Sequence, residues 1–285
     1  MSGVEGEAAG TTTSAGPMAG RSVVDVLMPA AARRPRRRRL VRELHWSQLK
    51  HMGRSPAHFK HAVLNPIEPT PAMRLGTLVH SLILGGRFHV WDGERRGAAW
   101  NEFETSHLGL IVTTKEVERA RRMADAVKAS PLAQPLLVGD KEREWETTMF
   151  GRRCAGRIDV SGRGFVVDVK TTNTAEPARF QRACLVAGYH GQCAWYAAAR
   201  RRLGERVDEC FIVGVESTAP HPVVVLRLTP RALEEGEKLN RSWIERLDGC
   251  ELADEWPGYT QSILDLDVPD DASDALLIDG EEVEL

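Results

Sequence analysis

The sequence predicts a protein of the α/β (α+β) class, in which helices cover both faces of a central mixed β-sheet. Runs rich in β-branched and aromatic residues, which are typical of strands, lie at 144–150, 154–160 and 165–170. Helix-like segments follow at 175–186 and 189–203. The chain has 285 residues, of which 42% are hydrophobic, so it is long enough to bury such a core.

The remaining elements follow in chain order. Ahead of the strands, the pattern predicts helices at 47–64, 72–84 and 114–129. Thr114 is the expected N-cap of the third helix, because its hydroxyl could accept a hydrogen bond from a free backbone amide. The expected turn between the second and third strands is Ser161-Gly162-Arg163-Gly164. The last predicted elements are strands at 209–216 and 222–228 and a helix at 230–247.

Composition divides the chain into a folded domain, residues 43–260, and two tails. We expect a disordered N-terminal tail at 1–42, which is rich in small and polar residues and contains the basic block Arg33–Arg39. Residues 261–285 are expected to form an acidic C-terminal tail. The formal net charge of −2 therefore hides a more basic middle, whose arginines could contact phosphates or simply be solvated.

Composition also argues against several protein classes. No apolar run is long enough to span a membrane, and the N-terminus lacks the hydrophobic region of a secretory signal. The 5 cysteines form no C-x-x-C pair, which argues against a zinc site and against a disulfide framework. We therefore expect a soluble, cytoplasmic protein.

The most informative feature is the predicted hairpin that carries Asp159 and, further along, the run Asp168-Val169-Lys170. Side chains alternate across a strand, so Asp168 and Lys170 share one face while the valines between and before them point to the other. A short hairpin would also place Asp159 beside Asp168 across the ladder. The pattern thus predicts two carboxylates and a lysine at one point.

Two carboxylates held this close repel each other unless a cation lies between them, and oxygen ligands of this kind suit Mg²⁺, with Mn²⁺ as a substitute. Lys170 could then hold or deprotonate an attacking water and offset charge in the transition state of phosphodiester hydrolysis. The alternative is an exposed hairpin whose aspartate and lysine form a surface ion pair, because the motif alone is short.

Four blocks of sequence, in order, decide between these interpretations. They are His45-Trp46-Ser47-Gln48-Leu49-Lys50 with Ser55-Pro56-Ala57-His58-Phe59-Lys60, then Gly76-Thr77-Leu78-Val79-His80, then the hairpin, and then Gln192 with Tyr196. Together they resemble the PD-(D/E)xK nuclease superfamily, and within it the RecB-like exonucleases of the RecE (exodeoxyribonuclease VIII) type of phages and prophages. The resemblance covers the chain from about His45 to Tyr259 and implies a restriction-endonuclease-like core.

The resemblance also implies a metal centre. Mg²⁺ would be bound by the side chains of His80, Asp159 and Asp168 and by the backbone carbonyl of Val169, with Lys170 positioning the nucleophile. Without the hairpin, His80 would more simply be a packed or surface histidine.

A further acidic ligand is expected at Glu146, in the strand ahead of the hairpin. However, Glu142, Glu144 and Glu146 alternate onto one face of that strand, so the sequence does not distinguish among them. Three solvated glutamates at the edge of a sheet are the competing interpretation.

The same resemblance implies DNA contacts. Gln192 and Tyr196 lie one helical turn apart, where an amide and a phenol could orient the strand at the scissile phosphate. Arg157 and Thr171, from the hairpin block, are the further residues expected to contact DNA. Ordinary helix packing by Tyr196, with Gln192 solvated, is the alternative.

The function implied is a Mg²⁺-dependent exonuclease that degrades double-stranded DNA ends from 5′ to 3′ and leaves 3′ single strands for a recombinase. A homo-oligomer and a single-strand annealing recombinase partner are implied in the same way. The alternatives are another RecB-like nuclease with single-strand or nicking activity, and a catalytically inactive DNA-binding module on the nuclease fold.

Overall fold

The computed structural model describes residues 39–260, 262–266, 275–278 and 281–284. Residues 1–38 of the expected disordered N-terminal tail, which include most of its basic block, lie outside the described residues. Within the segment expected as an acidic tail, two short strands pair antiparallel: β9 (Ala275–Ile278) and β10 (Glu281–Glu284).

Six strands form the central sheet in the order β1-β5-β6-β7-β8, with β4 paired to β5 as well. β1 and β5 are parallel, as are β6 and β7, while the other pairs are antiparallel, so the sheet is mixed as predicted. The strands are β1 (Leu44–His45), β4 (Asp140–Met149), β5 (Arg152–Gly162), β6 (Gly164–Thr172), β7 (Val207–Glu216) and β8 (Val223–Arg227).

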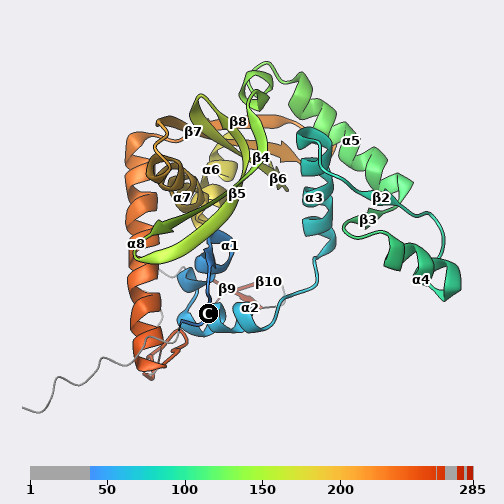
Figure 1. The fold of residues 1–285 in the computed structure, drawn as a ribbon. Coiled ribbons are helices and arrows are strands. Elements are labelled where there is room, and N and C mark those ends of the chain that lie inside the picture. Colours follow the sequence, from blue (N-terminus) through green and yellow to red (C-terminus); the bar gives the residue numbers. More distant parts are fainter. Residues whose placement is uncertain (1–38, 261, 267–274, 279–280, 285) are drawn as a thin grey trace, which may run out of the picture. The chain divides into compact units, whose positions relative to one another are not determined.

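Helices cover both faces of this sheet, as the sequence predicted (Figure 1). Around one face lie α1 (Trp46–Leu49), α2 (Pro56–Leu64), α6 (Pro177–Val186), α7 (Tyr189–Arg202) and α8 (Pro230–Ala253). The other face is covered by α3 (Pro71–Leu84) and α5 (Thr114–Ala129). None of the helices in the described part of the chain is long and apolar enough to cross a membrane.

Alternation along β6 separates two hydrophobic cores. Val167 and Val169 point into the core beneath α3 and α5, whereas Val166 joins the core beneath α6 and α7. Asp168 and Lys170 are on the same side of the strand as Val166. The prediction that Asp168 and Lys170 share one face, opposite Val167 and Val169, is therefore confirmed. The face with Asp168 and Lys170 also carries an apolar residue, Val166, which joins the second core.

The predicted helix at 47–64 is wrong as a single element, because it divides into α1, the 3₁₀-helix η2 (Lys50–Gly53) and α2. Ser55 is extended, with φ of −173°, and its hydroxyl accepts a hydrogen bond of 3.3 Å from the backbone amide of His58. Proline disfavours a helical conformation in the residue before it but fits the first turn of a new helix. Pro56 therefore ends one helix and begins the next.

The N-cap of α5 is Thr113, which corrects the prediction of Thr114. Thr113 and Glu116 form a capping box, in which each side chain bonds the other residue's backbone amide. The hydroxyl of Thr114 instead donates to Asp92 at 2.6 Å. The turn between β5 and β6 is also shorter than predicted, because Gly162 already pairs with Phe165 and Gly164 takes the positive φ of 85°.

Several short elements had no sequence signal strong enough to predict them. They are η3 (Gln134–Leu137), α4 (Gly97–Ser106) and a small parallel pair, β2 (His89–Val90) with β3 (Ile111–Val112). Trp91 lies 5.8 Å from Trp100 and 4.8 Å from Phe103 between ring centroids. Contacts between aromatic rings, rather than a helical repeat of apolar residues, stabilise this segment.

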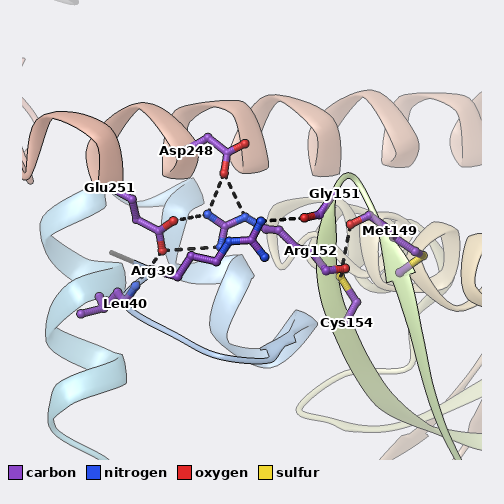
Figure 2. A network of polar contacts seen from close by, with 8 residues as sticks. All are labelled: Arg39, Leu40, Met149, Gly151, Arg152, Cys154, Asp248 and Glu251. Carbon is purple, nitrogen blue, oxygen red and sulfur yellow. Dashed lines mark hydrogen bonds and ion pairs between the residues drawn. The ribbon is translucent and has the colours of Figure 1, made fainter. Parts of the chain in front are cut away.

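A buried ion-pair network fixes the start of β5 against the end of α8 (Figure 2). The Arg152 side chain is 2% exposed, and its guanidinium donates to Asp248 at 2.7 Å and also pairs with the fully buried Glu251. Glu251 in turn accepts a hydrogen bond of 2.9 Å from the Leu40 amide, where the chain approaches β1. Because a buried charge without a partner is strongly unfavourable, the three segments are held together.

Among the described residues, replacing Glu251 with alanine leaves the Arg152 guanidinium with Asp248 as its remaining anionic partner. We expect Glu251→Ala to lower the free energy of unfolding by about 3 kcal/mol, measured by urea denaturation. The matched control is Glu237→Ala on the same helix, which removes a half-exposed pair with Arg201 and should change stability by less than about 1 kcal/mol. Equal effects of the two substitutions would contradict the role of the network.

Candidate active site

The candidate site is a cleft beside residues 156–159 of β5, where one edge of the strand is unpaired within the described part of the chain. β4 pairs with β5 along one edge, so β1 and β6 must share the other: β1 pairs at Cys154 and Ala155, and β6 pairs from Val160 to Gly162. Residues 156–159 have no strand partner on this edge within the described part of the chain. A cavity of about 860 Å³ is lined by Gly156, Arg157 and Asp159 of this interval, and by residues of β1, α1, β4, β6, α3 and α7.

The two aspartates lie where β5 and β6 separate. The last register pair of the hairpin is Val160 with Val167, so Asp159 and Asp168 are the next positions on the two strands. Asp159 Oδ2 accepts a hydrogen bond of 2.7 Å from the backbone amide of Val169. The amide and carbonyl of one strand residue point to the same edge, so the Val169 carbonyl is also directed toward β5.

A chain of polar contacts connects Asp168 to helix α7. Lys170 Nζ lies 2.6 Å from Asp168 Oδ2 and donates to Gln192 Oε1 at 3.1 Å. Gln192 Nε2 then donates to the Tyr196 hydroxyl at 2.8 Å. The ammonium group also lies 4.6 Å from the centre of the Tyr189 ring. Because these contacts fix the rotamer of Lys170, its charge is held at the aspartates.

His80 reaches the same point from the opposite face of the sheet. It lies on α3, which begins at Pro71 after the N-cap Thr70 and buries Leu78 and Val79 in the core. His80 Nδ1 is 3.6 Å from Asp159 Oδ1. The separation of β5 from β6 therefore allows helices on both faces to supply side chains to one cleft.

Burial and neighbouring charges act against each other on the pKa values of this group. Burial raises the pKa of Asp168 and outweighs the opposing charge of Lys170. Burial also opposes ionisation of Asp159, but His80, Lys170 and the Val169 amide together hold its pKa below the usual value. Burial alone would lower the pKa of Lys170, whereas the charges of Asp168 and Asp159 raise it, so this lysine is a stable cation.

Glu142 is the acidic residue that converges on this centre. Ligand atoms of His80, Glu142 and Asp159 all lie within 4.8 Å of one another. Glu142 has a left-handed backbone, with φ of 52°, at the position in the β4–β5 register opposite Asp159. This conformation costs about 1–2 kcal/mol for a residue with a side chain, and periodicity in the sequence gives no sign of it.

Glu146 lies elsewhere on the cleft wall. Its carboxylate pairs with Arg153 of β5, and its side chain is 52% exposed. Burial raises the pKa of Glu142, and its partner Arg157 opposes this shift. The structure therefore brings Glu142 into the converging group, and the expectation that Glu146 binds a metal stays a prediction.

The other residues expected to contact DNA are in different surroundings. Gln192 and Tyr196 line the cleft, as does Arg157. Thr171 alternates away from Lys170 and its hydroxyl lies under α3, where a Cβ at Gly76 would come within 3.2 Å of it. Access of DNA to Thr171 thus depends on the neighbouring turn of α3.

The donor set fits a hard divalent cation. Asp168 Oδ2 is buried and, apart from the ion pair with Lys170, has no hydrogen-bond partner among the described residues. Carboxylates, a backbone carbonyl and an imidazole are ligands that Mg²⁺ or Mn²⁺ accepts. Asp159, Asp168 and Glu142 would supply the carboxylates, with Val169 and His80 completing the set.

A protein-family model described as "PDDEXK-like domain of unknown function (DUF3799)" matches residues 45–264, which is most of the chain. The chain belongs to this family. Membership confirms the predicted PD-(D/E)xK superfamily and its restriction-endonuclease-like fold, and it makes the protein nuclease-like, with DNA as the expected class of substrate. The RecE-type assignment stays a prediction.

One solved structure shares the overall fold of this chain, and a second is less similar. A candidate exonuclease from Eubacterium rectale is 15% identical and superposes with a TM-score of 0.56 over 80% of this chain and 91% of that one. A phage-related exonuclease from Haemophilus somnus 129PT is 13% identical, with a TM-score of 0.33 over 46% of this chain and 69% of that one. A comparison of the sequence with curated proteins finds no match.

Glu142 and Glu146, both on β4, are expected to differ in their contribution to metal binding. Glu142→Gln should weaken Mn²⁺ binding about tenfold or more, because a carboxylate in the converging group is lost. Glu146→Gln is the matched control, since it removes the same charge from the same strand, and it should change the affinity less than about threefold. Isothermal titration with Mn²⁺ measures both. A larger loss from Glu146→Gln would instead support Glu146 as the ligand.

Proposed function

We propose that this protein is a Mg²⁺-dependent exodeoxyribonuclease, with Mn²⁺ as a substitute cofactor. The observation that supports this most is the convergence of Asp159, Asp168 and Lys170 in one cleft with His80. Structural ion pairs also occur in buried positions, but here Asp159, Asp168, Lys170 and His80 all line one cavity that is open to solvent, and the Glu142 carboxylate lies close to His80 and Asp159. The substrate would be the phosphodiester bond at the end of a linear DNA duplex.

When bound, Mg²⁺ would activate water and neutralise charge on the phosphate. The residues of this chain have separate tasks. Asp159 and Asp168 hold the cation, and the Val169 amide keeps the Asp159 carboxylate in place through its hydrogen bond of 2.7 Å. Lys170 would position the attacking water and stabilise the charge that develops on the phosphoryl oxygens.

Helix α7 would orient the DNA strand. Gln192 accepts from Lys170 and donates to Tyr196, so a phosphate that contacts either side chain is placed relative to the ammonium group. Arg157 has a 61% exposed side chain on the cleft wall and is the most accessible cation in this group. These contacts would fix the register of the strand without reading its sequence.

The direction and the biological setting rest on the resemblance to RecE-type exonucleases. We propose degradation from 5′ to 3′ on double-stranded ends, which leaves 3′ single strands for a recombinase in DNA recombination and repair. A homo-oligomer and a single-strand annealing partner belong to the same proposal.

The nuclease proposal is tested with purified protein, linear duplex and Mg²⁺. Asp168→Asn and Lys170→Met should each reduce the cleavage rate by about 10²- to 10⁴-fold, because each removes a group that acts in the transition state. EDTA should abolish cleavage. Asp208→Asn, which removes an exposed charge paired with Arg206, is the control and should cut at the normal rate. Undiminished cleavage by either site variant would contradict the assignment of this cleft as a nuclease active site.

A second experiment tests polarity with duplexes labelled at one end. A 5′-labelled strand should lose its label as a short product at the earliest times, whereas a 3′-labelled strand should shorten gradually before its label is released. Early release of a 3′ label would instead indicate degradation from 3′ to 5′. Cleavage of circular or single-stranded DNA at a higher rate would favour a nicking or single-strand nuclease. No cleavage with any metal would favour an inactive DNA-binding module.

A further inference from the structure

A second surface with the chemistry of a DNA contact extends from the rim of the cleft along α2. Between Leu44 and Ile67 the chain has no acidic residue, although it contains Lys50, Arg54 and Lys60 and four histidines. In a chain of net charge −2, such a segment is unusually basic. Polyanions are the partners that a local surplus of positive charge attracts.

This segment begins at the active-site cleft. Trp46 and Ser47 of α1 line the cleft, and Lys50 is the first residue of η2, directly after α1. Burial and the charge of Lys170 both lower the pKa of Lys50, so the two ammonium groups are close enough to repel each other. The basic segment is therefore continuous with the candidate catalytic centre.

An exposed tyrosine lies beside these cations. The segment Trp256–Tyr259 runs along α2, where the Ala57 amide donates to the Pro257 carbonyl at 3.1 Å. The Tyr259 ring is 5.2 Å from His58 between centroids, and its hydroxyl lies 3.5 Å from Arg54. Tyr259 nevertheless remains 72% exposed. An aromatic ring that is held by neighbouring side chains and is still mostly open to solvent is suited to stacking.

The neighbouring Trp256 anchors the segment. Its ring stacks on buried Phe59 at a centroid distance of 6.1 Å and an interplanar angle of 7°. Lys60 lies over the same ring, with Nζ 5.3 Å from the centroid. Because Trp256 is packed on α2, Tyr259 is held close to α2.

We propose that Lys50, Arg54, Lys60 and Tyr259, here called the α2 surface, bind the single DNA strand that continues from the scissile phosphate. Cations that follow a backbone, together with an aromatic ring that stacks on bases, are the means by which proteins hold single strands without sequence preference. The bases of an intact duplex are already stacked on one another, so Tyr259 selects an unpaired strand. This inference rests on the proposed function, because it names the part of the substrate held beside the catalytic centre.

Binding is measured separately from cleavage, in EDTA, by the fluorescence anisotropy of a labelled oligothymidine of about twelve nucleotides. Tyr259→Ala should weaken binding about tenfold, while Tyr259→Phe retains the ring and should bind nearly as well as the wild type. An abasic oligomer of the same length should bind the wild type and Tyr259→Ala equally. Equal binding of oligothymidine by the wild type and Tyr259→Ala would overturn the proposal.

The salt dependence tests the cations. Each phosphate contact to a single strand contributes about 0.7 to the slope of log affinity against log salt concentration, so the combined substitution of Lys50, Arg54 and Lys60 by alanine should reduce the slope by about 2. Arg121→Ala on α5 is the control, because it removes an exposed cation from another helix and should leave the slope unchanged. An unchanged slope in the triple variant, or an equal loss of blunt-duplex binding in Tyr259→Ala, would contradict single-strand binding.

Comparison with the cleavage assay separates the two proposals. If the wild type cuts no DNA but Tyr259→Ala binds oligothymidine more weakly than the wild type does, the nuclease assignment fails. The α2 surface then stands as a site that binds single-stranded DNA. If the wild type cuts DNA while Tyr259→Ala binds oligothymidine normally, the α2 surface alone is refuted.

Discussion

The burial of two carboxylates in one cleft is the constraint on which this structure depends. Asp159 and Asp168 would repel each other strongly if no positive charge lay nearby. Lys170 neutralises one side at 2.6 Å from Asp168, and His80 lies 3.6 Å from Asp159 on the other. These two partners come from a strand and from a helix on the opposite face. The aspartates can therefore stay charged in the buried cleft only when Lys170 and His80 are both held beside them by the sheet and its covering helices.

The cleft itself follows from how β5 divides its partners. One edge of β5 is paired with β4 along nearly its whole length, while the other edge is shared between β1 and β6. The unpaired interval includes Gly156, where a Cβ would come within 2.8 Å of the Trp145 ring. A larger residue there would push Trp145 out of the core. The Arg152 network holds the start of the same strand, and pairing with β6 holds its end. β5 is therefore fixed both before and after the residues that line the cleft.

Sequence patterns predicted most of the fold because they report local geometry. Alternation along β6 placed Asp168 and Lys170 on one face, and helical spacing placed Gln192 near Tyr196, and the structure agrees on both points. The break at Ser55 was also a local signal, since Pro56 follows it, but the apolar pattern on either side obscured it. The α4 segment could not be predicted in this way, because its aromatic rings pack on each other rather than on the main core.

The sequence by itself determined the chemistry of the candidate site: two carboxylates and a lysine on a hairpin, a histidine on an earlier helix, and a glutamine and a tyrosine on a later one. Only the tertiary structure shows which glutamate of β4 lies beside His80 and Asp159. Alternation places Glu142 and Glu146 on one face, yet the left-handed φ of Glu142 and its position opposite Asp159 bring its carboxylate to the centre. A backbone angle of this kind is imposed by the packing of neighbouring strands, and strand periodicity carries no record of it.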